Sequence, residues 1–369
     1  MQIGIGTKVA DVVQQFSQGN VSTTNNPLDL AINGNGFFRM SQNGAISYTR
    51  NGQFQLDKNG FIVNGNGLKL TGFPATSAGI IDGGSTTELQ IPSQDLAPKA
   101  TGKLGEVLNL DARAKEPLTT LFDPKDPTSY NFSTSVNIYD SLGNAHVFTD
   151  YFVKTATPNK WKLHATADGT STTNVDLGAG AGNPVDLDFD TNGKLTTTMP
   201  FNVSVDLDGV ALELGTTNGA TTPLKFKLDF TNTTQFGSGF GVNSLSQDGY
   251  TSGRPSGFNI AADGIILGRY TNGQSLVLGQ VALTNFRNPN GLISLGDNLW
   301  AVTSESGEPL VGAPGSGSLG ALQSAAVENS NVDLTQELVN MITAQRVYQA
   351  NAQSIKTQDS VLQTLVNLR

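Results

Sequence analysis

The chain has 369 residues, which is long enough for two or three domains, and it carries a formal net charge of −9 with 14% charged residues, against about 25% in an average globular protein. Its 22 Lys and Arg residues form no basic run and no apolar stretch approaches the roughly 18 residues that span a bilayer, so the sequence argues against nucleic-acid binding and membrane insertion. Without cysteine it has no disulfide, thiolate nucleophile or cysteine-bound metal.

Met1 is followed by Gln2–Gly6, which lacks both a basic start and an apolar core. A cleavable secretory signal is therefore not expected in the chain as given. The protein is expected either to stay in the cytoplasm or to leave by a route that needs no such signal.

From residue 3 to about 320 the pattern is that of β-strands. Short alternating apolar runs are separated by eleven Asn-Gly and five Asp-Gly pairs, the dipeptides that best supply the positive φ angles of a tight hairpin turn. Two linked hairpins are predicted over 37–63, with turns at Asn43–Gly44 and Asn59–Gly60. The body is therefore expected to be mainly antiparallel sheet.

The stretch from about 97 to 248 differs from its flanks, because it is richer in Thr and Asp and opens with three prolines. We expect it to be an outer β domain inserted into a middle β domain made of 27–96 and 249–322. Residues 1–26 would be a connecting segment, and 323–369 a helical end. The run Gly315–Gly320 has the composition of a flexible linker.

After Ala326 the pattern changes to that of a helix. Asp333 with Gln336 resembles a capping box, and apolar residues then follow a 4-3 alternation without Gly or Pro. The length and apolar stripe favour packing against other chains over packing on the body. The expected subunit interface consists of Leu334, Leu338, Met341, Ile342, Tyr348, Ala352, Ile355, Leu362, Leu365 and Val366.

The motifs that could indicate catalysis, cofactor binding or metal binding are weak. Gly315–Gly320 matches a dinucleotide-binding fingerprint, but no strand leads into it and no helix opens on it. Asp188–Gly193 copies half of a calcium loop, yet its twelfth position is Met199, so a hairpin turn is expected instead. His146 and His164 are too few for a three-histidine metal site and are expected to be surface or half-buried strand residues. We expect no enzyme activity and no cofactor or metal.

Several segments together resemble the flagellar hook proteins of bacteria. The resemblance covers nearly the whole chain and is carried by Leu28–Phe38, Tyr48–Asp57, Gly67–Pro74, Val136–His146 and the tail from Glu328 to Arg369. The first block and the tail also occur in distal rod proteins of the same axial family, but these typically lack so large an inserted domain.

The resemblance implies a structural subunit of a helical, tubular homopolymer outside the cell, which acts as a flexible joint carrying torque from rod to filament in motility. The implied partners are other copies of the chain, the distal rod, hook-cap and hook-filament junction proteins, and the type III export apparatus. The C-terminal helix would lie in the inner wall, where it would pair with an N-terminal helix of the family.

That N-terminal helix is missing from the chain as given, which would fit a truncated chain or a late start. Residues 1–26 offer only the short apolar run Val9–Phe16, so we expect residues 325–369 to be poorly ordered in an isolated monomer. The alternatives left open are a distal rod-like axial protein and a β-rich surface binding module with a helical oligomerisation tail.

Overall fold

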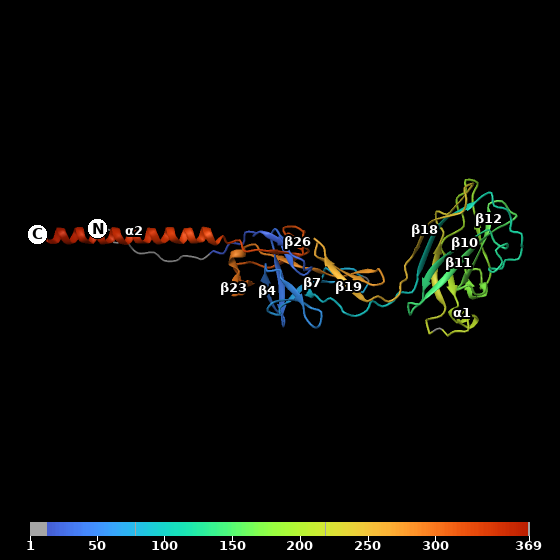
Figure 1. Cartoon of the computed structure of the whole chain (residues 1–369), viewed down its shortest axis with the longest axis horizontal. Helices are drawn as coiled ribbons and strands as arrows, with labels where there is room; N and C mark the ends of the chain where they lie inside the picture. The colour runs from blue at the N-terminus through green and yellow to red at the C-terminus, as the bar shows by residue number, and fades with distance from the viewer. Residues whose placement is uncertain (1–12, 78, 218, 368–369) are drawn as a thin grey trace. The chain divides into compact units, whose positions relative to one another are not determined.

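A computed structural model describes residues 13–77, 79–217 and 219–367, with the side chains of 366 and 367 left aside (Figure 1). The chain folds into two compact units. Unit 1 comprises Met1–Ser93, Gly257–Gly268 and Ser275–Arg369, and unit 2 comprises Gln94–Ser256 and Arg269–Gln274. Unit 2 therefore interrupts unit 1 in the sequence.

Before its final helix, unit 1 is built almost entirely from strands. They are β1 (Val21–Thr23), β2 (Leu30–Asn33), β3 (Phe37–Gln42), β4 (Ala45–Thr49), β5 (Phe54–Leu56), β6 (Ile62–Asn64), β7 (Lys69–Pro74), β8 (Thr87–Glu88), β19 (Pro255–Ile260), β20 (Ile265–Tyr270), β21 (Ser275–Val281), β22 (Leu283–Asn285), β23 (Ile293–Gly296), β24 (Leu299–Ala301), β25 (Leu310–Gly312), β26 (Ala321–Ser324) and β27 (Ala326–Glu328), with a 3-10 turn at Pro289–Gly291. Two of these strands, β19 and β20, each extend by two residues into the ranges of unit 2. The main sheet has the order β19-β20-β21-β7-β3-β4-β24-β23.

The predicted turn at Asn43–Gly44 is confirmed. Both residues have positive φ, 51° and 89°, as the tight turn between β3 and β4 requires. The second hairpin is also confirmed, because β5 pairs with β6 from Phe54 to Asn64. Phe38, Met40 and Leu70 are completely buried in the main core of unit 1, and Phe37 and Tyr48 belong to a second, smaller buried cluster.

Unit 2 contains two sheets that face each other. The four-stranded sheet has the order β10-β11-β12-β14, and the other has β13-β15-β16-β9-β17 with β18 also on β9. The elements are β9 (Lys103–Asp111), β10 (Phe132–Tyr139), β11 (Ala145–Lys154), β12 (Lys160–Ala167), a 3-10 turn (Thr172–Asn174), β13 (Val175–Asp176), β14 (Val185–Asp188), β15 (Phe201–Val205), α1 (Leu207–Glu213), β16 (Leu224–Asp229), β17 (Thr234–Phe236) and β18 (Gly241–Gln247).

Aromatic rings from opposite sheets meet in the core of unit 2. The Phe148 and Phe226 ring centroids are 5.3 Å apart, and those of Phe152 and Phe230 are 5.9 Å apart, both edge to face. The expected antiparallel arrangement holds for most pairs, but β9 runs parallel to both β16 and β17. Such pairs join strands far apart in the sequence, which local turn signals do not reveal.

The two chain segments that begin and end unit 2 run side by side as an antiparallel ribbon. Leu96 pairs with Gly253 and Lys99 with Tyr250. The Lys99 amide donates to the Tyr250 carbonyl at 3.0 Å, and the Tyr250 amide returns a bond of 2.9 Å. The chain therefore enters and leaves unit 2 at neighbouring positions.

One long helix follows the last strand of unit 1. α2 spans Leu334–Asn367, 34 residues, without interruption (Figure 1). Asp333 caps it as predicted, because its Oδ1 accepts from the amides of Thr335 at 2.8 Å and Gln336 at 3.2 Å. The Gln336 side chain instead donates to Asn340, so the capping box is only half formed. No helix in the described ranges is both long and apolar enough to cross a bilayer.

The predicted flexible linker at Gly315–Gly320 is wrong. Its ends are joined by a bond from the Gly315 amide to the Gly320 carbonyl, and the Gly320 amide donates to Asn35. Leu319 packs against the unit 1 core. The run is a turn that leads into β26 and β27. Gly320 lies too close to the backbone of Asn33 for a Cβ atom, whereas Gly315 and Gly317 have positive φ angles, 76° and 56°.

Candidate subunit interface

The apolar side chains of α2 lie exposed along the helix. Of the ten residues predicted as the interface, eight are large apolar side chains that are between 44% and 75% exposed, and Ala352 is half-buried. The side chain of Val366 lies outside the described residues. A helix of this length measures about 50 Å at 1.5 Å per residue. The structure thus places these residues on one continuous helix and shows no cover over them from the described part of the chain.

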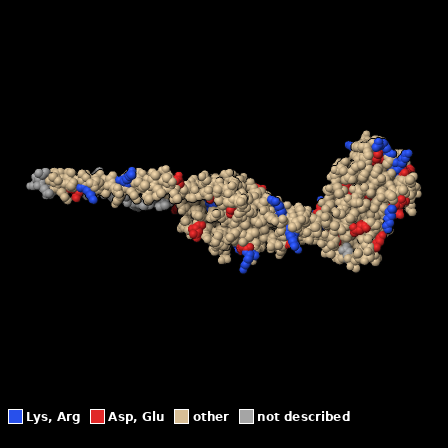
Figure 2. All heavy atoms as spheres, in the orientation of Figure 1, with Lys and Arg blue, Asp and Glu red and all other residues tan. Residues whose placement is uncertain are grey.

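Charge is sparse on α2. Between residues 334 and 367 only Glu337, Arg346, Lys356 and Asp359 are charged, and Figure 2 shows mostly uncharged atoms along the helix. A solvated surface helix normally carries many more charges. The side chains of α2 are therefore suited to contacts with other apolar surfaces.

An ion pair joins β27, the strand that precedes α2, to the loop that follows β4. Glu328 Oε2 lies 2.9 Å from an Arg50 terminal nitrogen, with side chains 10% and 14% exposed. The same guanidinium donates to the carbonyls of Gly34 and Gly36 at 3.0 Å. Because the guanidinium presents several donors in one plane, Arg50 binds both β27 and the turn at 34–36.

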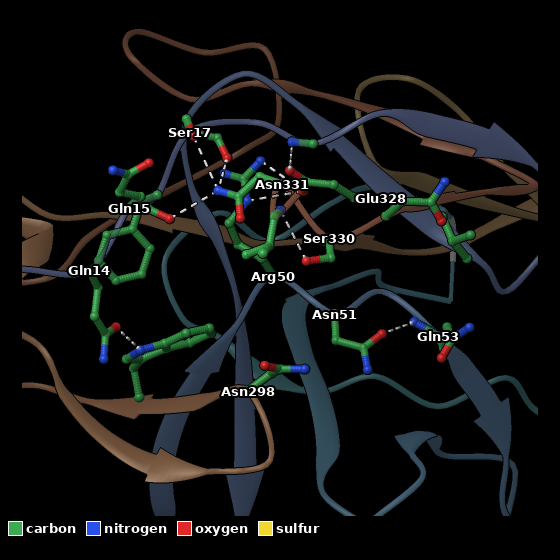
Figure 3. Close-up of a pocket in the computed structure, with 16 residues that line it drawn as sticks. Gln14, Gln15, Ser17, Arg50, Asn51, Gln53, Asn298, Glu328, Ser330 and Asn331 are labelled. Carbon is green, nitrogen blue, oxygen red and sulfur yellow. Dashed lines mark hydrogen bonds and ion pairs between the residues drawn. The ribbon is translucent and has the colours of Figure 1, made fainter. Parts of the chain in front are cut away.

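The same place holds the segment that precedes β1. Glu328 Oε1 accepts from the Gly19 amide at 2.9 Å, and the Asn331 side-chain nitrogen donates to the carbonyls of Gln15 and Ser17 at 3.1 and 2.9 Å (Figure 3). β1 and β27 then pair from Val21 opposite Glu328. We call this group of contacts the terminal clasp. It consists of the side chains of Arg50, Glu328 and Asn331 and the backbone groups that they bond, at Gln15, Ser17, Gly19, Gly34 and Gly36.

Aromatic side chains extend the contact of this segment. The Phe16 ring lies 5.6 Å from the Trp300 ring and 5.4 Å from the Phe37 ring, both edge to face. The Trp300 ring nitrogen donates to the Gln14 side chain at 2.8 Å. Residues 14–19 are therefore held on the β body by both apolar and polar contacts.

The clasp borders a hollow of about 560 Å³. Besides the clasp residues, polar side chains such as Gln53, Asn51 and Asn298 line it (Figure 3). Among the residues that the structure describes, no group of three or more His, Asp or Glu residues could hold a metal ion. The hollow offers amide and hydroxyl groups, which suit hydrogen bonds to a polypeptide.

The other motifs of the sequence serve structure in unit 2. The Asp188–Gly193 run forms the predicted turn, in which Asp190 Oδ1 accepts from the Asn192 and Lys194 amides at 2.8 Å. Both histidines are half-buried strand residues, as predicted. Burial, with Lys162 nearby, lowers the pKa of His164 to about 4.

His146 joins two turns of unit 2. Its Nδ1 lies 2.7 Å from Asp168 and its Nε2 lies 3.4 Å from Asp140. The hydrogen bond to Asp168 raises the pKa of His146 above its ordinary value, while burial opposes that rise. The protonated ring can donate to both carboxylates at once.

Sequence reasoning missed the terminal clasp. Arg50 and Glu328 are 278 positions apart, and a single Arg and a single Glu carry no periodic signal. The one usable sign was the pair of polar runs at Asn329–Asn331 and Gln14–Gln18 beside short apolar strands. From the sequence, residues 14–18 are predicted only as part of a connecting segment, and no contact is predicted for Asn329–Asn331.

Three family models match three parts of the chain. They are the flagellar hook protein FlgE/F/G D1 domain over residues 31–108, the flagellar basal body protein FlaE D2 domain over 109–250, and the flagellar basal body rod FlgEFG protein C-terminal over 323–368. Among whole proteins, the flagellar hook protein FlgE of Escherichia coli (strain K12) is 42% identical over 100% of this chain and 89% of its own length.

The chain belongs to the flagellar hook protein family. FlgE of Salmonella typhimurium is 43% identical with the same coverage of both chains. A crystal structure of Helicobacter pylori flagellar hook protein FlgE2 has a TM-score of 0.60 at 16% identity, and the match covers 84% of this chain and 100% of that one. That likeness supports the fold.

Membership defines the role of the chain. It is a structural subunit of the flagellar hook, an extracellular part of the flagellum. Hook proteins form a homopolymer, so contacts between copies are the functional contacts of this family. The boundary between the D1 and D2 family models at residues 108 and 109 falls inside β9, whereas the structure places the whole of β9 in unit 2.

Proposed function

We propose that copies of this hook protein polymerise by packing the apolar stripe of α2 against helices of neighbouring copies. The observation that carries the proposal is the exposed stripe itself, from Leu334 to Leu365. Leu338, Met341, Tyr348, Ile355 and Leu362 would each gain about 1.5–3 kcal/mol on full burial. Leu334, Ile342, Ala352, Leu365 and Val366 complete the proposed interface.

The proposal also concerns the isolated chain. A lone helix is only marginally stable in water, and most helical stability in proteins comes from packing of an apolar face. In a dilute monomer the amides of 334–366 should therefore exchange rapidly with solvent. Strong protection there would mean that the helix already has its partner, and it would overturn the assignment.

The β units would provide the adjustable part of the joint. A polymer that bends while it rotates must let contacts shorten on one side and lengthen on the other. Surfaces of Ser, Thr, Asn and Gly form wet contacts that exchange with small penalties, whereas apolar knobs along α2 commit to one register. This division supports a joint that transmits torque from rod to filament.

We also propose other flagellar proteins as partners of the chain. We include the distal rod, hook-cap and hook-filament junction proteins and the type III export apparatus as proposed partners, supported by the match of residues 323–368 to the rod protein C-terminal model. Chemical cross-linking in cells from positions on α2, followed by mass spectrometry, tests them. Cross-links confined to other proteins would contradict these assignments.

Catalysis is not part of the proposed function. The candidate motifs form turns, and the His146 cluster joins loops. Hydrolase and nucleotide-binding screens should be blank. A specific turnover that one carboxylate substitution abolishes would overturn this.

We also propose that 97–248 is a folding unit inserted between 27–96 and 249–322, with 1–26 as a connector and 323–369 as the inner end. The adjacent entry and exit strands support it. Replacing 97–248 by a short Gly-Ser link should leave a remainder that still melts cooperatively. A remainder without a cooperative melt would contradict the insertion.

A further inference from the structure

Two carboxyl groups are enclosed in the core of unit 2. Glu106 extends from β9 and is 1% exposed, and Asp150 extends from β11 and is fully buried. The two strands belong to opposite sheets, so the carboxyls meet across the core. Neither residue takes part in any contact discussed so far.

The pair has no hydrogen-bond partner among the described residues. All four of its carboxyl oxygens are buried without one, and the two groups are near enough for the charge of Glu106 to act on Asp150. A proton on one carboxyl would let it donate a hydrogen bond to the other. Two ionised carboxylates here would repel each other in a medium that solvates charge poorly, so the folded unit must hold at least one proton.

The groups that face the pair offer no compensating positive charge. On the same face of β11, His146 is bonded to Asp140 and Asp168, and Lys154 Nζ lies 4.8 Å from the Trp161 ring centroid. The core-facing residues of β10, β12, β14, β15 and β16 in the surrounding cluster are apolar.

The remaining titratable residues of these strands alternate with the core residues, and β17 and β18 carry none. They are Lys103 and Asp111 on β9, Tyr139 on β10, Tyr151 on β11, Lys160, Lys162 and His164 on β12, Asp186 and Asp188 on β14, and Lys225, Lys227 and Asp229 on β16.

We propose that Glu106 and Asp150 form a proton-dependent lock between the two sheets of unit 2, closed while the pair holds its proton and weakened when the pair ionises. The pKa values of both carboxyls are shifted in the direction that this proposal requires. Burial raises the pKa of Glu106 to about 7. Burial, and then the charge of Glu106, raise the pKa of Asp150 well above its ordinary value.

The sign of the pH effect follows from proton counts. In the unfolded chain both carboxyls ionise near pH 4. In the folded unit Glu106 keeps its proton up to about pH 7, and the pKa of Asp150 is also raised well above its ordinary value. The folded state therefore binds more protons in this window, and the stability of unit 2 must fall as pH rises. This is opposite to ordinary acid denaturation. Because the hook lies outside the cell, the external pH acts directly on the lock.

The two tryptophans make the test specific. Trp161 is fully buried in unit 2 and Trp300 lies in unit 1, so Trp300→Phe in the full chain leaves a fluorescence reporter for unit 2 alone. Urea unfolding is measured from pH 5 to pH 8 for this chain and for the same chain with Glu106→Gln and Asp150→Asn. The two amides can still hydrogen-bond to each other but cannot ionise.

The ratio of the two unfolding equilibrium constants isolates the pair. His164 opposes the effect below about pH 6.5 and His146 adds to it above that pH, but both contributions cancel in the ratio. We expect the ratio of parent to variant to rise between pH 5 and pH 7 by about tenfold per pH unit for each proton held. The control Asp186→Asn, an exposed carboxyl on β14, should leave the ratio constant. A ratio that does not change with pH would overturn the lock.

A second measurement covers a variant that fails to fold. Infrared spectra of the parent chain should show the carbonyl band of a protonated carboxyl at pH 6, where ordinary carboxyls are ionised, and the band should disappear reversibly at higher pH. Its absence at pH 6 would overturn the proposal.

Discussion

α2 and unit 2 handle apolar surface in opposite ways. Unit 2 encloses its large apolar side chains between two sheets, with Phe148, Phe152 and Phe230 fully buried, whereas Leu338 and Ile355 on α2 remain more than half exposed. The stability of unit 2 is therefore available to a single chain. In the proposed packing, the stability of α2 depends on other chains, so α2 would order when copies assemble.

The sharpest way to break this comparison is a charge on the stripe. Leu338→Asp should abolish hook formation, because a carboxylate in an apolar interface without a partner costs several kcal/mol. Electron microscopy of bacteria that produce only the variant counts the hooks, and unit 2 should melt unchanged. Thr343→Asp, on the opposite side of the helix, is the control and should keep most hooks. Normal hooks with Leu338→Asp would show that the stripe is not an interface.

A cavity in unit 2 tests the other side of the comparison. Phe152→Ala should destabilise unit 2 by about 3–5 kcal/mol, because it removes a fully buried ring and leaves a void. Urea unfolding followed at Trp161 measures the loss. Val147→Ala on the outer face of the same strand, where Val147 is 44% exposed, should cost far less. Equal losses from both variants would mean that the sheets do not enclose a tight core.

The terminal clasp is intermediate in burial between the core of unit 2 and the exposed side chains of α2. Arg50→Ala should destabilise unit 1 by about 2–4 kcal/mol, since it removes the donor to the poorly solvated Glu328 Oε2 and to the carbonyls of Gly34 and Gly36. Hydrogen exchange of the β1 and β27 amides should accelerate accordingly. The control is Lys69→Ala, which breaks the more exposed pair with Glu88 and should cost less than about 1 kcal/mol. Unchanged exchange in Arg50→Ala would contradict the clasp.

The smallest expected effect is a pH-dependent one at His146. Because its pKa is raised by the bond to Asp168, the stabilisation is fully present below pH 6.5 and is lost as pH rises through the raised pKa. His146→Gln should therefore destabilise unit 2 by about 1.5 kcal/mol at pH 6 and by less at pH 9. NMR titration of the imidazole gives the pKa directly. An equal loss of stability at pH 6 and pH 9 would contradict a protonated His146 bonded to Asp168 and Asp140.

Local signals predicted the local parts of the structure. The Asn43–Gly44 pair adopts the positive φ angles that such a dipeptide favours, and Asp333 caps a helix through its own neighbours. The 4-3 pattern likewise identified α2 and its exposed stripe, because helical periodicity needs no knowledge of the rest of the chain.

Features that join distant segments were not predictable. The parallel pairing of β9, the Arg50–Glu328 ion pair and the carboxyl pair of Glu106 and Asp150 each depend on how separate strands meet. The composition of Gly315–Gly320 misled for a related reason. Glycine allows both a mobile linker and a close backbone approach, and only the position of Asn33 distinguishes them.

The ribbon of Leu96 with Gly253 and Lys99 with Tyr250 has a consequence for how such proteins diversify. Paired residues of antiparallel strands lie about 5 Å apart, so the surrounding unit meets the same short gap whatever lies beyond the ribbon. Insertions and deletions beyond it therefore need not alter the rest of the molecule. Natural selection can enlarge, shrink or replace this domain among related bacteria while α2 and the rest of unit 1 stay the same.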